Sequence, residues 1–309
     1  MLTTGIRKIV TLFSSNFYQA GITPVAKQED SLLLEVKNAT KKFGNNVAVK
    51  DLSFTVSEPQ VIGIIGRSGA GKSTFLRMMN RMTDATSGEL LVNGSDVLSL
   101  RGRAKMDWQR NCAMIFQQFN LVPRLNVLTN VILGQLNQQS VLRSSLMFFS
   151  QAERHEALRL LDRFGVAQTA LQRAETLSGG QQQRVAICRA MMQRPEFVLA
   201  DEPIASLDPL NARLVMEALQ KINREENITV ICNLHTLDTA RTYCDRVIGM
   251  RAGEKVFDDV PAALSDAMAR EIYGAEAEEA FEASITSTSL DGNTAPVQSE
   301  PVAALAGAK

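Results

Sequence analysis

A glycine-rich segment at residues 66–74 carries the residue types that bind phosphate. It reads Gly66-Arg67-Ser68-Gly69-Ala70-Gly71-Lys72-Ser73-Thr74. Its glycines allow a tight turn whose backbone N–H groups point inward and form a nest for an anion. The ammonium of Lys72 can reach the β- and γ-phosphates of a nucleotide, and the hydroxyl of Ser73 can bind Mg²⁺. The segment predicts a nucleotide-binding loop, with a glycine-rich turn that binds nothing as the simpler alternative.

The elements on either side of this loop favour the first interpretation. Residues 61–65 form a short apolar run rich in β-branched side chains, which predicts a buried parallel strand. Residues 75–79 have the pattern of the first turns of a helix. A helix N-terminus adds partial positive charge and free N–H donors, so strand, glycine loop, Lys-Ser and helix together predict phosphate binding.

Two predicted strands end in residues that can act on a phosphate. Residues 196–200 lead into Asp201 and Glu202, and residues 228–232 are followed shortly by His235. The carboxylate of Asp201 can hold the Mg²⁺ of a nucleotide. Glu202 points another way and is suited to polarising the attacking water, while a neutral His235 can bond the γ-phosphate. The simpler alternative for the two acids is a solvated strand end, which the apolar residues before them disfavour. A lone histidine is more often a satisfied structural residue, but the other motifs favour the role at the phosphate.

A second helix start has the features of an anion site. Residues 177–184 read Leu-Ser-Gly-Gly-Gln-Gln-Gln-Arg and open a helix predicted over 185–193. Ser178 supplies a hydroxyl, Gly179 and Gly180 are the two glycines, and Gln181 follows them. A helical stretch separates this start from the glycine loop in the sequence. Both can therefore serve one ligand only if two chains meet.

Composition limits the class of protein. The 309 residues allow one large domain or two small ones. Lysine plus arginine and aspartate plus glutamate both number 33, so no basic excess predicts nucleic-acid binding. The sequence contains no run of about 18 apolar residues, so no membrane span is predicted. The four cysteines, at 112, 188, 232 and 244, lack a metal-binding spacing and are expected to be buried, reduced thiols.

The two ends differ from the rest of the chain. In residues 1–30 apolar side chains recur at helical spacing, which predicts either an amphipathic helix on a membrane or partner surface or a poorly ordered extension. From about Gly274 alanine, glutamate, serine and threonine dominate, so residues 274–309 are expected to form a disordered tail.

The intervening residues show alternating strand and helix patterns. Further strands are expected at residues 32–36, 48–54, 90–92 and 112–116, a turn at 41–44, helices at 101–110, in much of 118–176 and at 213–223, and a closing hairpin at 245–257.

Together these motifs resemble the ATP-binding subunits of ABC transporters. The glycine loop, Gln117, residues 177–181, Asp201-Glu202, residues 205–208 and His235 follow the order and spacing of that family. The resemblance covers roughly residues 31–273. It implies an α/β P-loop NTPase (RecA-like) core with a peripheral antiparallel β subdomain and an inserted helical subdomain at about 118–176. It also implies ATP and Mg²⁺ as cofactors.

The resemblance implies a role for each motif. Phe43 matches the aromatic residue that stacks on adenine, and Gln117 the glutamine that contacts Mg²⁺ and senses the permease. Residues 66–74 match the phosphate loop, with Ser73, Gln117 and Asp201 as metal ligands. Glu202, His235 and Lys72 match the catalytic residues. Ser178 to Gln181 match the signature that binds the γ-phosphate across the dimer, and Asp208 the loop that links the two sites.

A narrower resemblance is to the phosphonate-import branch. Residues 141–149 are similar to an insertion of that branch, whereas Asn233 and Thr236 replace the usual Thr and Gln beside the histidine, and Cys188 a common Ala. The branch implies a homodimer peripheral to the cytoplasmic face of the inner membrane, an integral-membrane permease and an extracytoplasmic phosphonate-binding protein. The alternatives are an importer of polar amino acids or another oxyanion, and a soluble ABC-type ATPase switch in a cytosolic complex.

Overall fold

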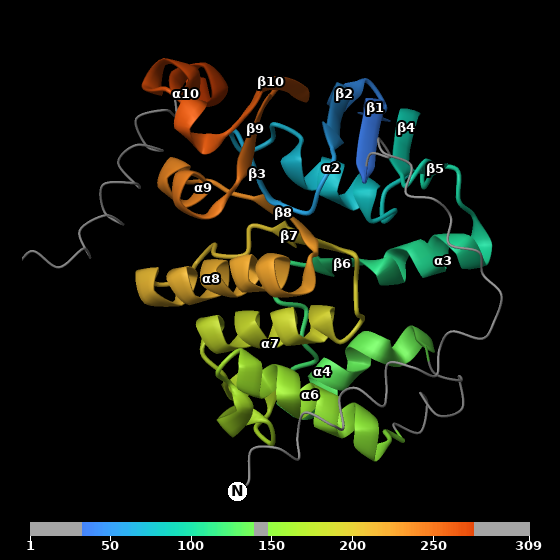
Figure 1. The fold of residues 1–309 in the computed structure, drawn as a ribbon, viewed down its shortest axis with the longest axis vertical. Coiled ribbons are helices and arrows are strands. Elements are labelled where there is room, and N and C mark those ends of the chain that lie inside the picture. Colours follow the sequence, from blue (N-terminus) through green and yellow to red (C-terminus); the bar gives the residue numbers. More distant parts are fainter. Residues whose placement is uncertain (1–32, 139–147, 275–309) are drawn as a thin grey trace, which may run out of the picture. The chain divides into compact units, whose positions relative to one another are not determined.

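Two β-sheets organise residues 33–138 and 148–274, the parts of the chain that the computed structural model describes (Figure 1). The antiparallel sheet has the order β2-β1-β4-β5, from β1 (Leu34–Phe43), β2 (Asn46–Val56), β4 (Ser87–Val92) and β5 (Ser95–Asp96). The predicted amphipathic segment at 1–30, most of the 141–149 insertion and the predicted tail after Gly274 lie outside the described residues.

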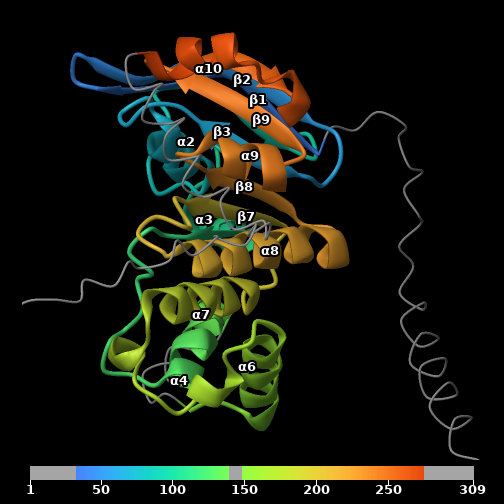
Figure 2. The ribbon, with the colours of Figure 1, turned by 90° about the vertical axis from the view of Figure 1, so that its left-hand side faces the viewer.

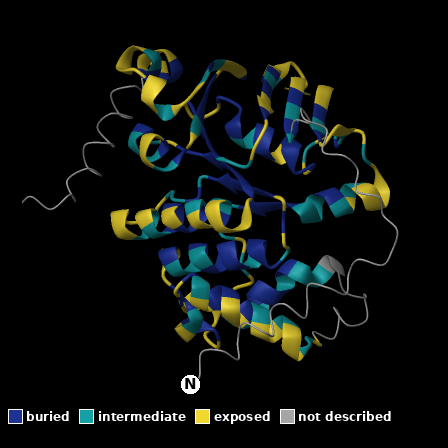
Figure 3. Cartoon of the chain, viewed as in Figure 1, coloured by how far each residue is buried: buried dark blue, intermediate teal, exposed yellow. Residues whose placement is uncertain are grey.

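The second sheet has the order β10-β9-β3-β8-β7-β6. Its strands are β3 (Val61–Ile65), β6 (Cys112–Ile115), β7 (Phe197–Asp201), β8 (Thr229–Asn233), β9 (Arg246–Arg251) and β10 (Glu254–Asp259). Five of the six pair in parallel, and β10 closes the edge antiparallel to β9. The central strands are buried on both faces (Figure 3), which is why their sequences are continuously apolar.

Helices cover both faces of this sheet. They are α2 (Lys72–Met79), α3 (Gly102–Asn111), α4 (Val127–Ile132), α6 (Gln151–Arg163), α7 (Gly179–Met191), α8 (Pro209–Glu226), α9 (Leu237–Tyr243) and α10 (Asp266–Tyr273). On one face α2 lies between β7 and β2 of the antiparallel sheet, so it packs between the two sheets. On the other face lie α7, α8, α9 and α10.

The strands alternate between these two faces. In β7, Phe197 and Leu199 point into the core shared with α2, whereas Val198 and Ala200 point into the core shared with α7 and α8. The period of two residues follows from the pleat of a strand. It places the next residue, Asp201, on the α2 face, beside the end of the phosphate loop.

The segment between β6 and β7 is helical, as expected. Figures 1 and 2 show α4, α6 and α7 packed together beneath α8. A capping box begins α6, because the Ser150 hydroxyl accepts from Glu153 N at 3.2 Å and the Glu153 carboxylate accepts from Ser150 N at 2.6 Å. Gly165, at φ 68°, follows the end of α6.

Three local expectations were wrong in their bounds. Lys41, Lys42 and Phe43 are strand rather than turn, because β1 stays paired with β2 up to Phe43 opposite Asn46. Residues 87–89 belong to β4 rather than preceding it. The helix expected at 185–193 begins at Gly179, because Ser178 and Gln181 form a reciprocal capping box there. Helices α9 and α10 were not predicted, since both are short.

The fold class is confirmed: an α/β core with an antiparallel β subdomain and an inserted helical region. Among the helices at 33–138 and 148–274, none has the length and apolar character needed to cross a membrane.

Candidate nucleotide-binding and hydrolysis site

The glycine loop joins β3 to α2, in the predicted context. Gly66 and Gly71 have φ values of 147° and 102°, which favour glycine. A side chain at Gly66 would lie 2.2 Å from the Met250 carbonyl oxygen, and one at Gly71 would lie 2.2 Å from that of Ala48. These two glycines are therefore fixed by the close approach of neighbouring backbone as well as by the turn.

The hairpin of β9 and β10 holds the loop from the side. Gly253 N donates to the carbonyl of Ala70 at 3.0 Å, and Lys50 N of β2 donates to Gly253 O at 2.9 Å. Arg67, Ser68 and Gly69 are exposed, so this part of the loop is accessible to a ligand. The two sheets and the loop thus meet at one point.

Lys72 is buried beneath the loop, with 4% of its surface exposed. Its ammonium donates to the carbonyls of Gly66 at 2.5 Å and Arg67 at 3.0 Å. These bonds hold the positive charge inside the curve of the backbone, where a phosphate oxygen can compete for it.

Asp201 lies beside the first turn of α2, as the strand alternation requires. Its Oδ1 accepts from the Ser73 hydroxyl at 2.7 Å and from Asn233 Nδ2 at 2.7 Å. Asp201 and Asn233 are register partners in β7 and β8, so adjacent strands supply both side chains. The Arg77 guanidinium lies 3.8 Å from the other carboxylate oxygen.

These oxygens fit a magnesium ion. Mg²⁺ prefers hard oxygen ligands at about 2.1 Å, so adjacent ligands of an octahedron lie roughly 3 Å apart. The hydroxyl of Ser73 and the carboxylate of Asp201 are 2.7 Å apart, close to that separation. Asn233 Oδ1 is buried and has no hydrogen-bond partner among the described residues, while its amide nitrogen donates to the carboxylate. The donor set is therefore of the right kind.

Glu202 leaves the strand alternation, because its backbone is left-handed at φ 54°. Its Oε1 lies 2.6 Å from His235 Nε2. The carboxylate is mostly covered and the imidazole is 44% exposed, so the pair faces outward from the carboxyl ends of β7 and β8. The structure thus forms three groups of site residues. Lys72 contacts Gly66, Ser73 and Asn233 both contact Asp201, and Glu202 contacts His235.

The signature segment lies elsewhere in the same chain. Ser178 is exposed at the start of α7, and Gly180 faces Asn211, where a side chain would collide at 2.2 Å. The nearest neighbours of Gly179 are Leu207 and Phe119, not the phosphate loop. In one chain, the nearest neighbours of these two glycines are thus residues other than 66–74.

Asp208 caps α8, and its carboxylate accepts from Asn211 N at 3.1 Å and Asn211 Nδ2 at 2.6 Å. These bonds hold the pKa of Asp208 below its ordinary value. The cap therefore fixes the segment that touches Gly179 and Gly180.

Phe43 and Gln117 are both exposed. Phe43 ends β1, with its ring 51% exposed and the Lys41 ammonium 4.7 Å from the ring centre. Gln117 lies in the turn after β6, whose neighbour in the sheet is β7. Both remain accessible to a ligand or a partner.

The backbone after Gln117 is held by an arginine that no sequence motif singles out. Phe119 and Asn120 are both left-handed, at φ 53° and 51°. Arg189 of α7 donates to both of their carbonyl oxygens, at 2.8 and 2.5 Å, and burial lowers the pKa of its guanidinium. This side chain connects the loop after β6 to the helix that begins with the signature.

The far end of α2 is also anchored. The indole of Trp108 in α3 donates to Met79 O at 2.7 Å, and Asn80 Nδ2 donates to Cys112 O at the start of β6. Trp108 is therefore a packing residue. The end of α2 is therefore bonded to α3 through Trp108 and to β6 through Asn80. Since α3 leads directly into β6, both bonds connect α2 to the strand that precedes Gln117.

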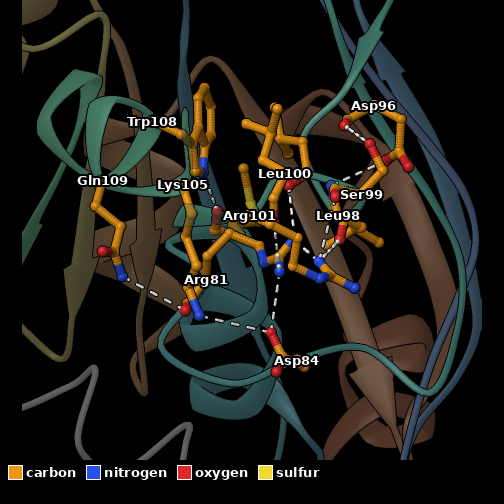
Figure 4. A network of polar contacts seen from close by, with 12 residues as sticks. Arg81, Asp84, Asp96, Leu98, Ser99, Leu100, Arg101, Lys105, Trp108 and Gln109 are labelled. Carbon is orange, nitrogen blue, oxygen red and sulfur yellow. Dashed lines mark hydrogen bonds and ion pairs between the residues drawn. The ribbon is translucent and has the colours of Figure 1, made fainter. Parts of the chain in front are cut away.

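A buried arginine completes this anchor (Figure 4). Arg81 is 2% exposed, and its guanidinium donates to Val97 O at 2.6 Å, Leu100 O at 3.3 Å and Asp84 at 3.0 Å. Lys105, 3.7 Å from Asp84, and Arg81 together hold the pKa of that carboxyl below its ordinary value. The network secures α2 to the β4–β5 hairpin and α3.

Comparison with known proteins identifies the family. Residues 49–205 match the family described as "ABC transporter". The "Phosphonates import ATP-binding protein PhnC" of Rhizobium johnstonii is 58% identical over 260 residues, covering 84% of this chain and 93% of that protein. The protein of the same name from Rhizobium meliloti is 60% identical over 259 residues, covering 84% and 92%.

Solved structures agree with the fold. A dimeric ATP-binding cassette in a post-hydrolysis state, bound to ADP and Pi, is 32% identical and superposes with a TM-score of 0.66 over 74% of this chain and 98% of that one. An ATP-binding cassette of an ABC transporter in its ADP conformation, 23% identical, has a TM-score of 0.69 over 82% and 99% of the two chains. The chain has the P-loop NTPase fold and belongs to the ABC transporter family as an ATPase domain.

Proposed function

We propose that this chain is the ATP-hydrolysing subunit of an importer that takes up phosphonates. The carrying observation is the 58% identity to a phosphonate-import ATP-binding protein across nearly its whole length. The nucleotide chemistry stands on the geometry of residues 66–74, 201, 202 and 235. The phosphonate specificity rests on the relatives, because an ATPase need not contact the transported compound.

Nucleotide binding is assigned to the loop and its surroundings. The backbone of residues 66–74 cradles the phosphates, and Lys72 moves its ammonium from the carbonyls of Gly66 and Arg67 to phosphate oxygens. Phe43 presents an exposed ring on which adenine stacks. Ser73 and Asp201, with Gln117, hold Mg²⁺, which when bound neutralises charge on the phosphate oxygens.

Hydrolysis is assigned to Glu202 with His235. The Glu202 carboxylate has one oxygen on His235 and keeps the other to accept a proton from the attacking water. The imidazole bonds the γ-phosphate and orients the water. The base lies in a partly covered site, where its negative charge acts over a short distance with little screening.

A second copy of the chain completes the site. ATP-binding cassettes form dimers, and in this chain the nearest neighbours of Gly179 and Gly180 lie outside the phosphate loop. In a homodimer the α7 N-terminus of one chain covers the phosphates held by the other. Asp208, which fixes the segment beside that N-terminus, links the two sites.

The remaining assignments concern the assembly. Residues 31–273 form the ATPase domain, with a helical subdomain at about 118–176 that docks on an integral-membrane permease. The protein is thus peripheral to the cytoplasmic face of the inner membrane. A separate extracytoplasmic protein captures the phosphonate. Residues 1–30 and 274–309 are extensions to that domain.

Uptake in cells tests the proposal. A strain lacking this gene is given the wild-type gene, the Glu202→Gln variant or an empty vector, and uptake of a radiolabelled alkylphosphonate is measured beside phosphate and a polar amino acid. Restored uptake of the phosphonate alone, by the wild type alone, is the expected result. Restored uptake of an amino acid instead would overturn the phosphonate assignment while leaving the ATPase role intact.

A further inference from the structure

The last described helix ends against the hydrolysis site. Helix α10 (Asp266–Tyr273) begins where the Ser265 hydroxyl accepts from Met268 N at 3.3 Å. At its other end Tyr273 is 4% exposed, and its hydroxyl donates to the backbone carbonyl of His235 at 3.0 Å. The two residues are 38 positions apart in the chain. A buried phenol thus bonds the backbone of the residue that faces Glu202.

The packing of α10 fixes where this phenol lies. The side chain of Ile272 fills the space over Gly249 of β9, where an added side-chain carbon would lie 2.6 Å from it. Arg251 donates to Glu271 O at 3.1 Å and so holds the end of the helix to the same strand. A helix held by apolar packing on one side and a charged hydrogen bond on the other has little freedom to shift.

The same hydroxyl also neighbours the phosphate loop. Burial raises the pKa of Tyr273, and a hydrogen bond from the backbone of Gly66 offsets part of that rise. A hydroxyl can accept one bond while it donates another. The phenol therefore stands between the first residue of the phosphate loop and the peptide of His235.

The backbone is held close to His235 on both sides. Leu234 N donates to Ile64 O of β3 at 2.9 Å, and α9 begins at Leu237. His235 and Thr236 alone connect these fixed points. Because a side chain follows its own backbone, a bond to the His235 carbonyl constrains the direction in which the imidazole leaves the chain.

We infer that Tyr273 is a positioning residue for ATP hydrolysis, which aligns His235 with the phosphate loop through the His235 backbone carbonyl. The inference rests on the hydrolytic role proposed for His235 and Glu202. It assigns α10 a part in the ATPase cycle, although the helix lies outside the segment that matches the family profile.

The test compares four variants of the full-length protein in an ATPase assay. They are Tyr273→Phe, His235→Ala, the double variant and Tyr243→Phe as the matched control. Tyr243 is a half-buried tyrosine of α9 beside Glu217 and Arg213. Tyr273→Phe is expected to lower kcat about three- to tenfold, the effect of losing one buried hydrogen bond, with the KM for ATP within about twofold. Tyr243→Phe should leave both parameters unchanged.

The double variant separates positioning from general stability. If Tyr273 acts through the imidazole, Tyr273→Phe has no further effect once His235 is alanine. Multiplicative losses in the double variant, or a melting temperature that falls together with kcat, would overturn the inference. A His235→Ala variant with normal turnover would refute the proposed role of His235 itself. If His235→Ala lowers kcat as expected but Tyr273→Phe leaves kcat unchanged, the role of Tyr273 is refuted and that of His235 is not.

Discussion

Nε2 of His235 lies 2.6 Å from Oε1 of Glu202, a close polar contact between residues that follow adjacent strands of the parallel sheet. The contact places the proposed base, Glu202, beside His235, the residue proposed to bind the γ-phosphate. Because His235 Nε2 lies at the Glu202 carboxylate, an imidazole that turns toward the γ-phosphate also changes the surroundings of the proposed base. The γ-phosphate contact and the orientation of Glu202 are therefore coupled.

Glu202→Gln should abolish turnover and preserve ATP binding. Glutamine keeps the size of the side chain and a carbonyl that can accept from His235, but it cannot take a proton from water. General-base catalysis contributes about 10²- to 10⁴-fold, so hydrolysis should fall by at least about 100-fold. Steady-state ATPase rates and nucleotide titration measure the two effects, and size-exclusion chromatography with ATP should show a trapped dimer. Glu196→Gln, just before β7, is the control, and normal hydrolysis by Glu202→Gln would refute the assigned base.

Lys72→Ala should weaken ATP binding at least about tenfold, because a hydrogen bond to a charged group contributes about 1.5–3 kcal/mol. The loss should fall on affinity, since the ammonium lies inside the loop at the carbonyls of Gly66 and Arg67. Isothermal titration calorimetry measures it. Lys221→Ala, on the exposed face of α8, removes an equal charge far from the loop and should bind normally. Unchanged nucleotide affinity in Lys72→Ala would contradict the loop assignment.

Asp201→Asn should raise the Mg²⁺ concentration needed for half-maximal hydrolysis. The variant keeps the side-chain volume but removes the negative charge that makes the site suit a hard cation. It also places an amide where the carboxylate accepts from Ser73 and Asn233. Titration of Mg²⁺ at fixed ATP measures the shift, with Asp238→Asn in α9 as the control. A variant with wild-type Mg²⁺ dependence would show that Asp201 does not hold the metal.

The sequence predicted the parts of this site that depend on neighbours along the chain. The alternation of Phe197 and Leu199 in β7 extends to Asp201 and turns it toward α2, and the glycine spacing located the loop. The tight turn at Gly66 follows from residue type alone. Local pattern sufficed because a strand period and a turn are both properties of a few consecutive residues.

Contacts between distant segments were beyond that reach. Asn233 appeared only as an unusual neighbour of His235, and its bond to Asp201 follows from the register of β7 with β8. Arg189 and Tyr273 donate to backbone carbonyls, which every residue type has, so the sequence does not indicate which residue accepts the bond. The short helices α9 and α10 are set by packing on the sheet more than by their own periodicity.

Asp258→Asn should destabilise the protein in a pH-dependent way. Burial alone would raise the pKa of Asp258, but hydrogen bonds from Arg246 and Lys255 outweigh it and hold the pKa below its ordinary value of 3.8. A carboxyl with a lowered pKa stabilises the fold fully above its unfolded pKa, and this stabilisation is lost as the pH falls through the folded value.

The free energy of unfolding should therefore fall by about 1 kcal/mol at pH 7, with screening by solvent included. The difference between wild type and variant should be constant from neutral pH down to about pH 5 and close below about pH 4. Urea unfolding at several pH values measures both. Asp259→Asn, the next residue of β10, is the control. A difference that widened at acid pH would contradict the direction of the shift.

Mixing two inactive variants should restore activity if the site is shared between chains. Lys72→Ala damages the phosphate loop, and Ser178→Arg places a bulky side chain at the exposed start of α7. In a mixed dimer, the intact loop of the Ser178→Arg chain meets the intact signature of the Lys72→Ala chain, so one complete site forms.

Activity should appear on mixing and rise with total protein concentration, because the mixed dimer forms by association. Each variant alone should remain inactive at every concentration. As a control, mixing Lys72→Ala with Glu202→Gln should give no activity, because both lesions affect the side of the site that carries the loop and the base. Activity in that control mixture, or none in the first, would mean that the two anion sites do not combine across chains.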